Sequence, residues 1–205
     1  MAAKATAVHE WLRAYASPHM TDLRSADVPG PRADDHVRGP DDAPVVLFYG
    51  DFACPKCATA YHRLRDAPVR LTFRHFALRA KHPRALALAH AAEAAANQGR
   101  FWDLADALYK DQGRLEDPHL WAHCEALGID LARFDADRRG DDVAQRVRRD
   151  VHDALRAGAT ATPTVWVAQG DPDLLDTMVT FGIREARRIG PPTDGRARKG
   201  STYEQ

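Results

Sequence analysis

Apolar and polar positions in the first half of the chain predict two strands joined by a helix. Residues 45–49 form an uninterrupted apolar run, whereas residues 69–75 alternate apolar side chains with charged or polar ones. Both patterns are typical of β-strands when turn residues flank them. The segment between them, from Cys57 to about Arg65, has apolar positions at helical spacing. We therefore expect a β-α-β unit whose strands are parallel and joined in the right-handed sense.

The chain is helical in pattern from about residue 82 to residue 158. Apolar spacing and helix start and stop residues divide this region into separate helices. Their expected ranges are 83–96, 101–108, 117–127 and 143–157, with a short piece around Leu131 and Phe134. In the last helix an apolar side chain recurs at every fourth position: Val143, Val147, Val151 and Leu155. We interpret the region as an all-helical insertion between two β segments.

The chain beyond the insertion returns to strand patterns. Residues 164–167 are β-branched or aromatic and follow a proline, which predicts a strand that begins at a turn. A further strand is expected at 177–181 and a short helix at 183–189. Together with the first unit, these segments predict an α/β fold that is interrupted by helices.

Domain boundaries follow from these patterns and from the chain length. Residues 34–190 should form one folded domain, because 205 residues are too few for two ordinary domains. Residues 1–33 are expected to form an N-terminal arm, with a short amphipathic helix at 3–16 as one interpretation. Residues 17–44, which are rich in Pro, Gly and Asp, predict an extended lead-in with turns. Residues 191–205 are polar and predict a disordered tail.

Charge and composition exclude several classes of partner. The 29 basic and 29 acidic residues cancel, so no net charge draws the chain to nucleic acid or to an anionic membrane. Neither residues 1–13 nor any later window has the apolar run of a signal peptide or of a membrane span. The 3 cysteines agree with a reducing compartment. We expect a soluble cytoplasmic protein and leave its oligomeric state open.

The candidate chemistry lies directly after the first strand, where a Gly-Asp turn leads into Cys54-Pro55-Lys56-Cys57. Proline is favourable at the first position of a helix, which makes Cys54 the expected N-cap. Free amide groups and the helix dipole would lower the pKa of the Cys54 thiol, and the Lys56 ammonium would add to this effect. We predict Cys54 as a nucleophile and Cys57, one turn later, as the thiol that resolves a mixed disulfide.

Two other interpretations of the cysteine pair stay open. A C-x-x-C is half of a zinc site, but the further cysteine is Cys124, so histidines such as His62 or His75 would have to supply the remaining ligands. A structural disulfide across so short a loop would contribute little stability. We expect no metal.

The third cysteine and two histidines have a structural interpretation. Cys124 lies at helical spacing from Leu120 and Leu127, which predicts a buried and inert thiol rather than a third redox partner. His75 and His82 lie where the second strand ends and the insertion begins, close to the predicted thiol site. We interpret each as a surface or hydrogen-bonded histidine.

A second informative motif is Thr162-Pro163, directly before a predicted strand. Proline cannot donate to a strand ladder and belongs at the first residue of a strand, where a cis bond can form a tight turn. We predict that the Thr162-Pro163 bond is cis. A trans proline that opens an edge strand is the alternative, because few X-Pro bonds are cis.

The two motifs make the chain similar to a known family, the DsbA-like thioredoxin-fold oxidoreductases. The segments that carry the resemblance are 35–40, 43–45, 49–57, 74–78, 100–102 and 161–164. They contain C-P-K-C and T-P-T in order and span about residues 34–170. The first three segments resemble in particular the cytoplasmic, antiporter-associated branch of the family.

This resemblance implies a thioredoxin fold with an inserted helical domain, exchange between dithiols and disulfides, and no bound cofactor. It also implies that Thr162 and Pro163 dock the substrate backbone beside the disulfide. Family members often carry a buried acid six residues before the first cysteine, which is thought to move protons for the resolving thiol. Phe48 stands there in this chain, and Asp51 is the nearer acid that would handle the proton. The segment after residue 170 is shorter than is usual in the family.

These observations predict a protein-disulfide oxidoreductase with a dithiol mechanism. Its partners would be protein or low-molecular-weight thiols and disulfides, with glutathione as one candidate. Two alternatives stay open. The cysteine pair could sense oxidation and change a binding surface without turnover, which Phe48 favours. A glutathione-using transferase or isomerase of the same fold would not need Cys57.

Overall fold

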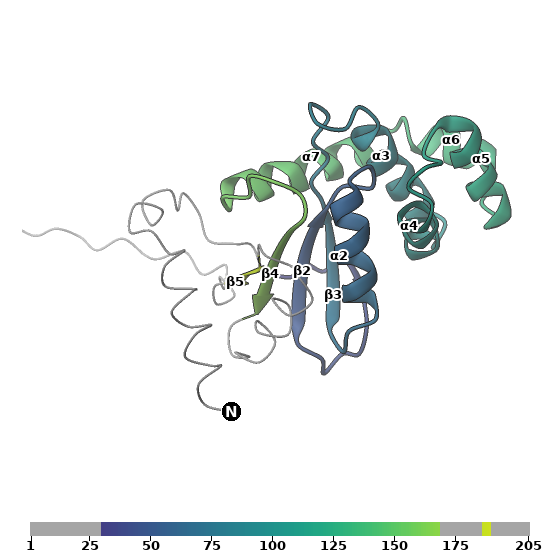
Figure 1. The fold of residues 1–205 in the computed structure, drawn as a ribbon. Coiled ribbons are helices and arrows are strands. Elements are labelled where there is room, and N and C mark those ends of the chain that lie inside the picture. Colours follow the sequence, from purple (N-terminus) through teal and green to yellow (C-terminus); the bar gives the residue numbers. More distant parts are fainter. Residues whose placement is uncertain (1–29, 169–185, 190–205) are drawn as a thin grey trace, which may run out of the picture.

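A five-stranded mixed sheet forms the centre of the molecule (Figure 1). The computed structural model describes residues 30–168 and 186–189. The strands are β1 (His36–Arg38), β2 (Val45–Gly50), β3 (Arg70–His75), β4 (Thr164–Ala168) and β5 (Ala186–Ile189). Their order across the sheet is β1-β3-β2-β4-β5.

β2 and β3 form the parallel pair that the sequence predicts, with Val45 opposite Arg70 and Gly50 opposite His75. The helix α2 (Pro55–Arg65) connects them. β4 pairs antiparallel with β2, and β1, which lies in the predicted lead-in, pairs antiparallel with β3. Every residue of β2 after Val45 is buried. A strand of this kind has to be covered on both faces, which explains its central position.

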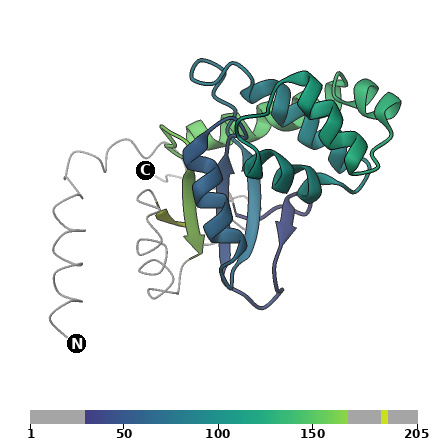
Figure 2. The same ribbon diagram turned by 45° about the vertical axis from the view of Figure 1, so that its right-hand side comes forward.

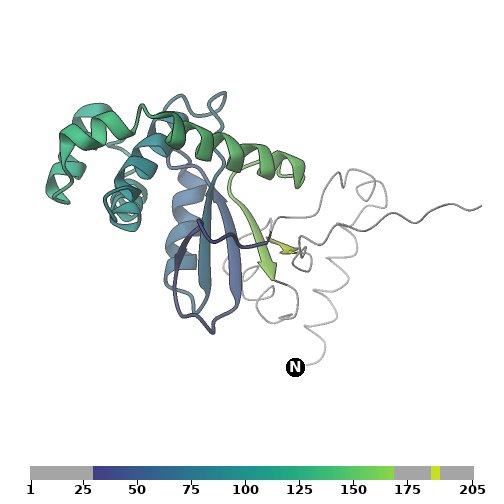
Figure 3. The same cartoon turned by 180° about the vertical axis from the view of Figure 1, so that it is seen from behind.

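Alternate residues of β2 face two different layers of helices. Val46 and Phe48 belong to the larger core cluster, together with the buried side of α2. Leu47 and Tyr49 belong to a second cluster that contains Trp166. α2 lies in front of the strands in Figure 1, and the helix α7 (Asp141–Arg156) crosses them on the opposite side in Figure 3. The C-x-x-C turn therefore starts from an enclosed strand.

The chain between β3 and β4 is helical, as predicted. Its helices are α3 (Ala85–Ala96), α4 (Phe101–Lys110), α5 (Asp117–Ala126), α6 (Leu131–Asp137) and α7. Figures 1 and 2 show them gathered at the end of the sheet where β2 leads into α2. The expected fold class is thereby confirmed: an α/β fold of the thioredoxin type with a helical insertion. None of the described helices has the length and apolar character that a bilayer crossing needs.

One predicted apolar position of α7 is wrong. Val143 and Val147 are buried, but Leu155 is 55% exposed. A step of four residues exceeds one turn by about 40°, so three such steps place Leu155 about 120° away from Val143 around the helix. Ala154 takes the buried position instead.

The prediction of a helix over residues 183–189 is also wrong for its described part. Ala186–Ile189 form β5, which pairs parallel with β4. The edge of β4 supplies main-chain partners that a local sequence pattern does not reveal, and tertiary context overrides local propensity. Three other predictions lie outside the described residues: the helix at 3–16, the strand at 177–181 and the tail at 191–205.

A buried ion pair fastens the segment before β1 to β3. The side chains of Arg74 and Asp35 are both fully buried, and two hydrogen bonds of 2.8 and 2.7 Å join them. Arg74 also donates to the carbonyl oxygen of Gly30 at 2.7 Å and to the Tyr49 hydroxyl at 3.1 Å. Burial alone would lower the pKa of Arg74, but the bonds to Asp35 and Tyr49 raise it. The guanidinium therefore stays charged inside the protein.

Asp35→Ala should lower the free energy of unfolding by about 3–5 kcal/mol, because it removes the carboxylate that balances a buried charge. Arg70→Ala is the control on the same strand: Arg70 pairs with Asp41, whose side chain is 97% exposed. This loss should cost no more than about 1 kcal/mol. Urea unfolding measures both variants, and equal losses would contradict the importance of the buried pair.

Candidate active site

Cys54 occupies the N-cap of α2, as the sequence predicts. Its backbone is extended (φ −99°, ψ 115°), and Pro55 is the first residue of the helix. The Cys54 amide donates to the carbonyl oxygen of Asp51 at 3.1 Å and closes the turn before the helix. Because proline has no N–H, the amide groups of the following residues are the ones available to the Cys54 sulfur.

The pKa of the Cys54 thiol is lowered to about 5. The largest cause is a hydrogen bond from the Cys57 thiol, which outweighs the opposing effect of burial. The Thr162 side chain and the backbone amides of Cys57 and Lys56 lower the pKa further. Each of these donors stabilises the thiolate, so the ionised sulfur predominates at neutral pH.

Cys57 has a raised pKa, in contrast to Cys54. It is completely buried, and the backbone N–H of Asp51 donates to its sulfur at 3.4 Å. Burial raises the Cys57 pKa, and the hydrogen bond and charge of Cys54 raise it further. Both residues are free thiols in this structure. The site thus holds an ionised sulfur next to a neutral one.

The role expected for the Lys56 ammonium is only partly supported. The Lys56 side chain is exposed. The backbone amide of Lys56, and not its ammonium, is among the leading causes that lower the Cys54 pKa. Water and salt screen a solvated ammonium, whereas the amide is fixed at the start of the helix. The lowered pKa of Cys54 therefore depends mainly on the Cys57 thiol, and the backbone amides at the start of the helix contribute more than the Lys56 ammonium.

The loop before β4 lies against Cys54. The Cys54 sulfur is 3.7 Å from the carbonyl oxygen of Thr162, which comes 108 positions later in the chain. The peptide bond between Thr162 and Pro163 is cis, the isomer that the sequence predicts. The Thr164 hydroxyl donates to the carbonyl oxygen of Ala161 at 2.6 Å within this loop. The pairing of β4 with β2 brings the two sequence motifs together.

Asp51 is the acid that the sequence offers in place of one at Phe48, and it lies next to Cys57. Its Oδ1 accepts a hydrogen bond from the Ala53 amide at 2.8 Å. Its Oδ2 is 2.8 Å from Nδ1 of His82, whose side chain is 24% exposed. Phe48 is fully buried in the apolar core. Asp51 and His82 are 31 positions apart in the chain, and no local sequence pattern predicts their contact.

His36, His75 and Glu93 are the described residues whose potential metal-ligand atoms lie within 4.8 Å of one another. Glu93 Oε1 is 2.8 Å from His36 Nε2 and 2.7 Å from His75 Nε2, and Oε2 pairs with Arg146 at 2.9 Å. Burial would raise the Glu93 pKa, but the two histidines lower it. A guanidinium at this distance opposes a divalent cation. We interpret the group as a buried hydrogen-bond network.

The zinc interpretation of the cysteines gains no support from the described residues. Neither Cys54 nor Cys57 belongs to the group of potential ligands above. The two histidines considered for zinc are bonded elsewhere: His62 Nε2 is 3.3 Å from a carbonyl oxygen of α4, and His75 contacts Glu93. A tetrahedral site would need ligands that are not gathered here.

Cys124 is a buried thiol of α5, as predicted. It is fully buried in the same core cluster as Leu120 and Phe134. Burial raises the pKa of its thiol to about 11, so the thiol is neutral at physiological pH. A neutral thiol packed among apolar side chains behaves as a small apolar residue.

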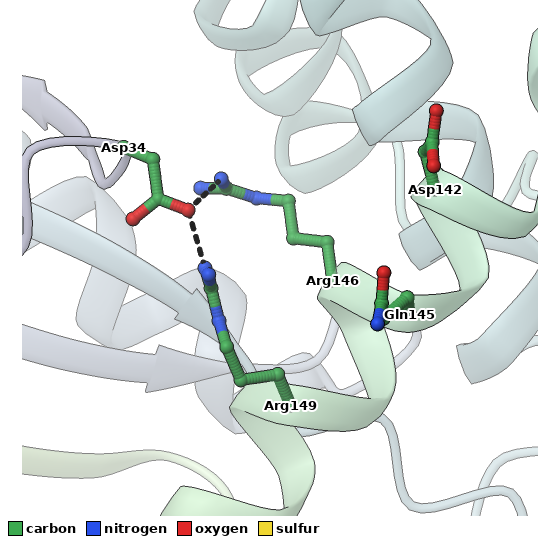
Figure 4. A pocket seen from close by; sticks show the side chains of 5 residues that line it. All are labelled: Asp34, Asp142, Gln145, Arg146 and Arg149. Carbon is green, nitrogen blue, oxygen red and sulfur yellow. Dashed lines mark hydrogen bonds and ion pairs between the residues drawn. The ribbon is translucent and has the colours of Figure 1, made fainter.

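A charged pocket of about 460 Å³ lies along α7 (Figure 4). Its lining residues are Asp34, Asp142, Gln145, Arg146 and Arg149. Arg146 and Arg149 point toward Asp34 and pair with its Oδ2 at 3.1 and 2.7 Å. The two cations are thus held by a carboxylate, and no thiol lines the pocket. The candidate chemistry lies at the start of α2 instead.

A family model described as thioredoxin matches residues 32–172. The match includes both cysteines of the C-x-x-C and the Thr162-Pro163 loop, and it covers more than half of the chain. The chain belongs to the thioredoxin family. This assignment agrees with the observed sheet and with the position of the cysteine turn after β2.

Curated relatives of this thioredoxin-family chain carry antiporter names. It is 44% identical over 142 residues to Na(+)/H(+) antiporter NhaA 1 of Salinispora arenicola, a match that covers 65% of this chain and 21% of the relative. It is 38% identical over 167 residues to Na(+)/H(+) antiporter NhaA of Herminiimonas arsenicoxydans, covering 78% of this chain and 26% of the relative. The chain thus spans about a quarter of the length of these relatives. Their names agree with the antiporter-associated branch that the sequence resembles.

Solved structures of DsbA-like proteins share the fold. A thioredoxin-like oxidoreductase from Silicibacter pomeroyi has a TM-score of 0.63 at 21% identity, over 75% of this chain and 94% of that one. The thiol-disulfide exchange protein alpha-DsbA2 from Wolbachia pipientis has a TM-score of 0.61 at 16% identity, over 72% of this chain and 87% of that one. The thioredoxin-family domain described here therefore shares its fold with these two proteins.

The thiolate of Cys54 gives a titration prediction. Alkylation of Cys54 in the reduced protein, followed by mass spectrometry, should have its midpoint at about pH 5, against about 8.5 for an ordinary cysteine. Because the folded pKa is lowered, the thiolate stabilises the reduced protein fully above the unfolded pKa, and this stabilisation is lost as the pH falls through about 5. A midpoint above about pH 8 would contradict the assignment.

Two substitutions separate the causes of this shift. Cys57→Ala removes the largest donor to the Cys54 sulfur and should raise the alkylation midpoint by about one pH unit or more. Lys56→Gln removes a solvated charge and should move the alkylation midpoint by less than about half a pH unit. The same alkylation assay measures both variants. A larger shift for Lys56→Gln than for Cys57→Ala would mean that the ammonium is the main cause.

Proposed function

We propose that this thioredoxin-family protein exchanges disulfides with protein thiols through Cys54 and Cys57. The observation that carries the proposal is the contrast between the two sulfurs. Cys54 has a pKa of about 5, while Cys57 is buried, has a raised pKa and donates a hydrogen bond to Cys54. The thiolate is the attacking form of cysteine, and a neighbouring thiol can resolve the mixed disulfide.

In the first step the Cys54 thiolate attacks one sulfur of a substrate disulfide. A bond forms between Cys54 and that sulfur, the substrate S–S bond breaks, and the other substrate sulfur leaves as a thiolate. In the second step Cys57 loses its proton and attacks the Cys54 sulfur. The Cys54–Cys57 disulfide forms and the second substrate sulfur is released, so the protein is oxidised and the substrate is reduced by two electrons.

The reverse sequence donates the disulfide to a substrate dithiol. The Cys54 thiolate exists in the reduced protein and not in the disulfide, so its stabilisation favours the reduced state. A stabilised reduced state makes the disulfide more oxidising. We therefore propose donation as the favoured direction when the partner is a protein dithiol.

The exposure of the residues around Cys54 supports a proposal for how a substrate reaches it. Cys54 is only 4% exposed. Beside it, Pro55 and Lys56 are exposed and Pro163 is half-buried. We propose that these residues form the edge on which a substrate chain rests, with Thr162 and Pro163 contacting its backbone. Pro55 and Lys56 would then act in substrate contact and helix geometry.

Protein thiols and disulfides are the proposed substrates, with glutathione as the small-molecule alternative. The site of action we propose is the cytoplasm. The low cysteine content supports a compartment in which structural disulfides are rare. The DsbA-like fold of the solved relatives supports the substrate class.

A redox sensor without turnover is a second candidate function. Two features favour it: Cys57 is fully buried with a raised pKa, and the apolar Phe48 stands where family members often carry an acid. Both features would slow resolution by Cys57. A sensor would form the disulfide and return to the dithiol state without processing successive substrate molecules.

Insulin reduction with excess dithiol tests these candidates: the wild-type protein should complete many turnovers, and Cys54→Ser should lose all activity. When Cys57→Ser is mixed with insulin without added dithiol, it should retain a mixed disulfide that mass spectrometry detects on Cys54. A single turnover in the wild type would favour the sensor. Full multiple-turnover activity in Cys57→Ser would contradict the dithiol mechanism and favour a glutathione-type enzyme.

A further inference from the structure

Resolution by Cys57 poses a proton problem. Cys57 must lose a proton to attack the mixed disulfide, yet it is completely buried and its pKa is raised. A buried thiol with a raised pKa needs a nearby base inside the protein that can accept its proton. Phe48, six positions before Cys54, is an apolar core residue and cannot serve as this base.

Asp51 is a buried acid whose backbone contacts Cys57. Its backbone N–H donates to the Cys57 sulfur at 3.4 Å, and its carboxylate is fully buried. The charge of Asp51 is also one of the causes that raise the Cys57 pKa, so the carboxylate and the thiol act on each other electrostatically. A buried carboxylate beside a buried thiol is a suitable proton acceptor.

His82 connects Asp51 to the surface. Its Nδ1 is 2.8 Å from Asp51 Oδ2, and its side chain is 24% exposed. The His82 amide donates to Leu78 at 3.0 Å, and its carbonyl oxygen accepts from Ala85 at 2.9 Å. These bonds hold the residue in the loop between β3 and α3. The ring therefore joins a fully buried carboxylate to solvent.

From this arrangement we propose that Asp51 and His82 form the proton relay of Cys57, an inference that rests on the dithiol exchange proposed above. As Cys57 attacks Cys54, its proton passes to the Asp51 carboxylate. His82 then returns the pair to its starting protonation state by exchanging a proton with water. The bond between Cys57 and Cys54 forms, the bond between Cys54 and the substrate breaks, and the substrate sulfur leaves as a thiolate. In the reverse direction the pair supplies the proton.

Other ionisable groups face the same site. Cys54 and Tyr109 interact electrostatically with the Cys57 thiol, and Tyr109 also interacts with Asp51. The Tyr109 hydroxyl is buried and has no hydrogen-bond partner among the described residues. Burial raises the Tyr109 pKa, so the phenol stays protonated and cannot accept the proton. Arg79 and Lys81, in the loop that carries His82, are exposed.

Asp51 also has a structural contact that a test must preserve. Its Oδ1 accepts from the Ala53 amide in the turn before Cys54. Asp51→Asn keeps an oxygen for this bond and adds an amide that can donate to His82, but asparagine accepts no proton at neutral pH. His82→Gln changes only the partly exposed end of the relay. His90→Gln is the control, because His90 is a half-buried histidine of α3 that bonds to the backbone of Arg138.

The experiment is a single turnover with the reduced full chain and an aromatic disulfide that releases a coloured thiolate. Attack by Cys54 releases the first thiolate, and attack by Cys57 releases the second, so rapid mixing resolves the two steps. Asp51→Asn should leave the first step within about twofold of wild type and slow the second by about tenfold or more. His82→Gln should slow the second step by about threefold or more. His90→Gln should change neither.

The pH profile separates a proton-transfer role from a structural one. The second step of Asp51→Asn should accelerate with rising pH and approach the wild-type rate in alkaline buffer, because hydroxide replaces the missing base. In His82→Ala, added imidazole should restore the second step. A second step that Asp51→Asn and His82→Gln leave at the wild-type rate would overturn the relay.

The same traces test the proposed function independently. Two thiolates per wild-type protein and one for Cys57→Ser support dithiol exchange, whatever the relay variants do. One thiolate for the wild type would overturn dithiol exchange and the relay with it. Should Asp51→Asn fail to fold, the decision rests on His82→Gln, His82→Ala and imidazole, because this side chain lies at the surface end of the pair.

Discussion

The placement of Cys54 at the first turn of α2 is the constraint on which the site depends. A helix start has amide groups without partners inside the helix, and a thiolate at the N-cap satisfies them. The same placement puts Cys57 one turn further on, inside the core, where it donates to Cys54 but cannot meet solvent. Activation of one sulfur and burial of the other are therefore two results of a single backbone geometry.

The enclosed centre of the molecule also contains polar side chains that need partners. β3 lies in the middle of the molecule yet carries Arg74 and His75, and buried polar groups cost free energy unless they are paired. Asp35 from the lead-in and Glu93 from α3 supply the partners. Arg146 of α7 contacts Glu93 as well. These networks join the helical insertion to the sheet, so the packing of the insertion and the enclosure of the thiol site are linked.

Local patterns predicted most of the described fold because strands and helices have fixed periods that the apolar residues follow. These patterns gave wrong predictions where contacts with another element decide which residue is buried or which element forms. Leu155 follows the apolar spacing but rotates out of the interface, and residues 186–189 pair with the edge of β4. For the site, the N-cap position of Cys54 could be predicted from Pro55. The contribution of the Lys56 ammonium to the Cys54 pKa could not be predicted, because solvent exposure is a property of the folded state.

The sequence by itself determined that two cysteines lie at the start of a helix after a buried strand, because spacing and proline chemistry are local. The tertiary structure decided which groups meet there. The Thr162 loop contacts Cys54 through the pairing of β4 with β2, and His82 meets Asp51 through the loop after β3. Electrostatics and hydrogen bonds act over a few ångströms of space, so the protonation of Cys54 and Cys57 depends on neighbours that sequence distance does not reveal.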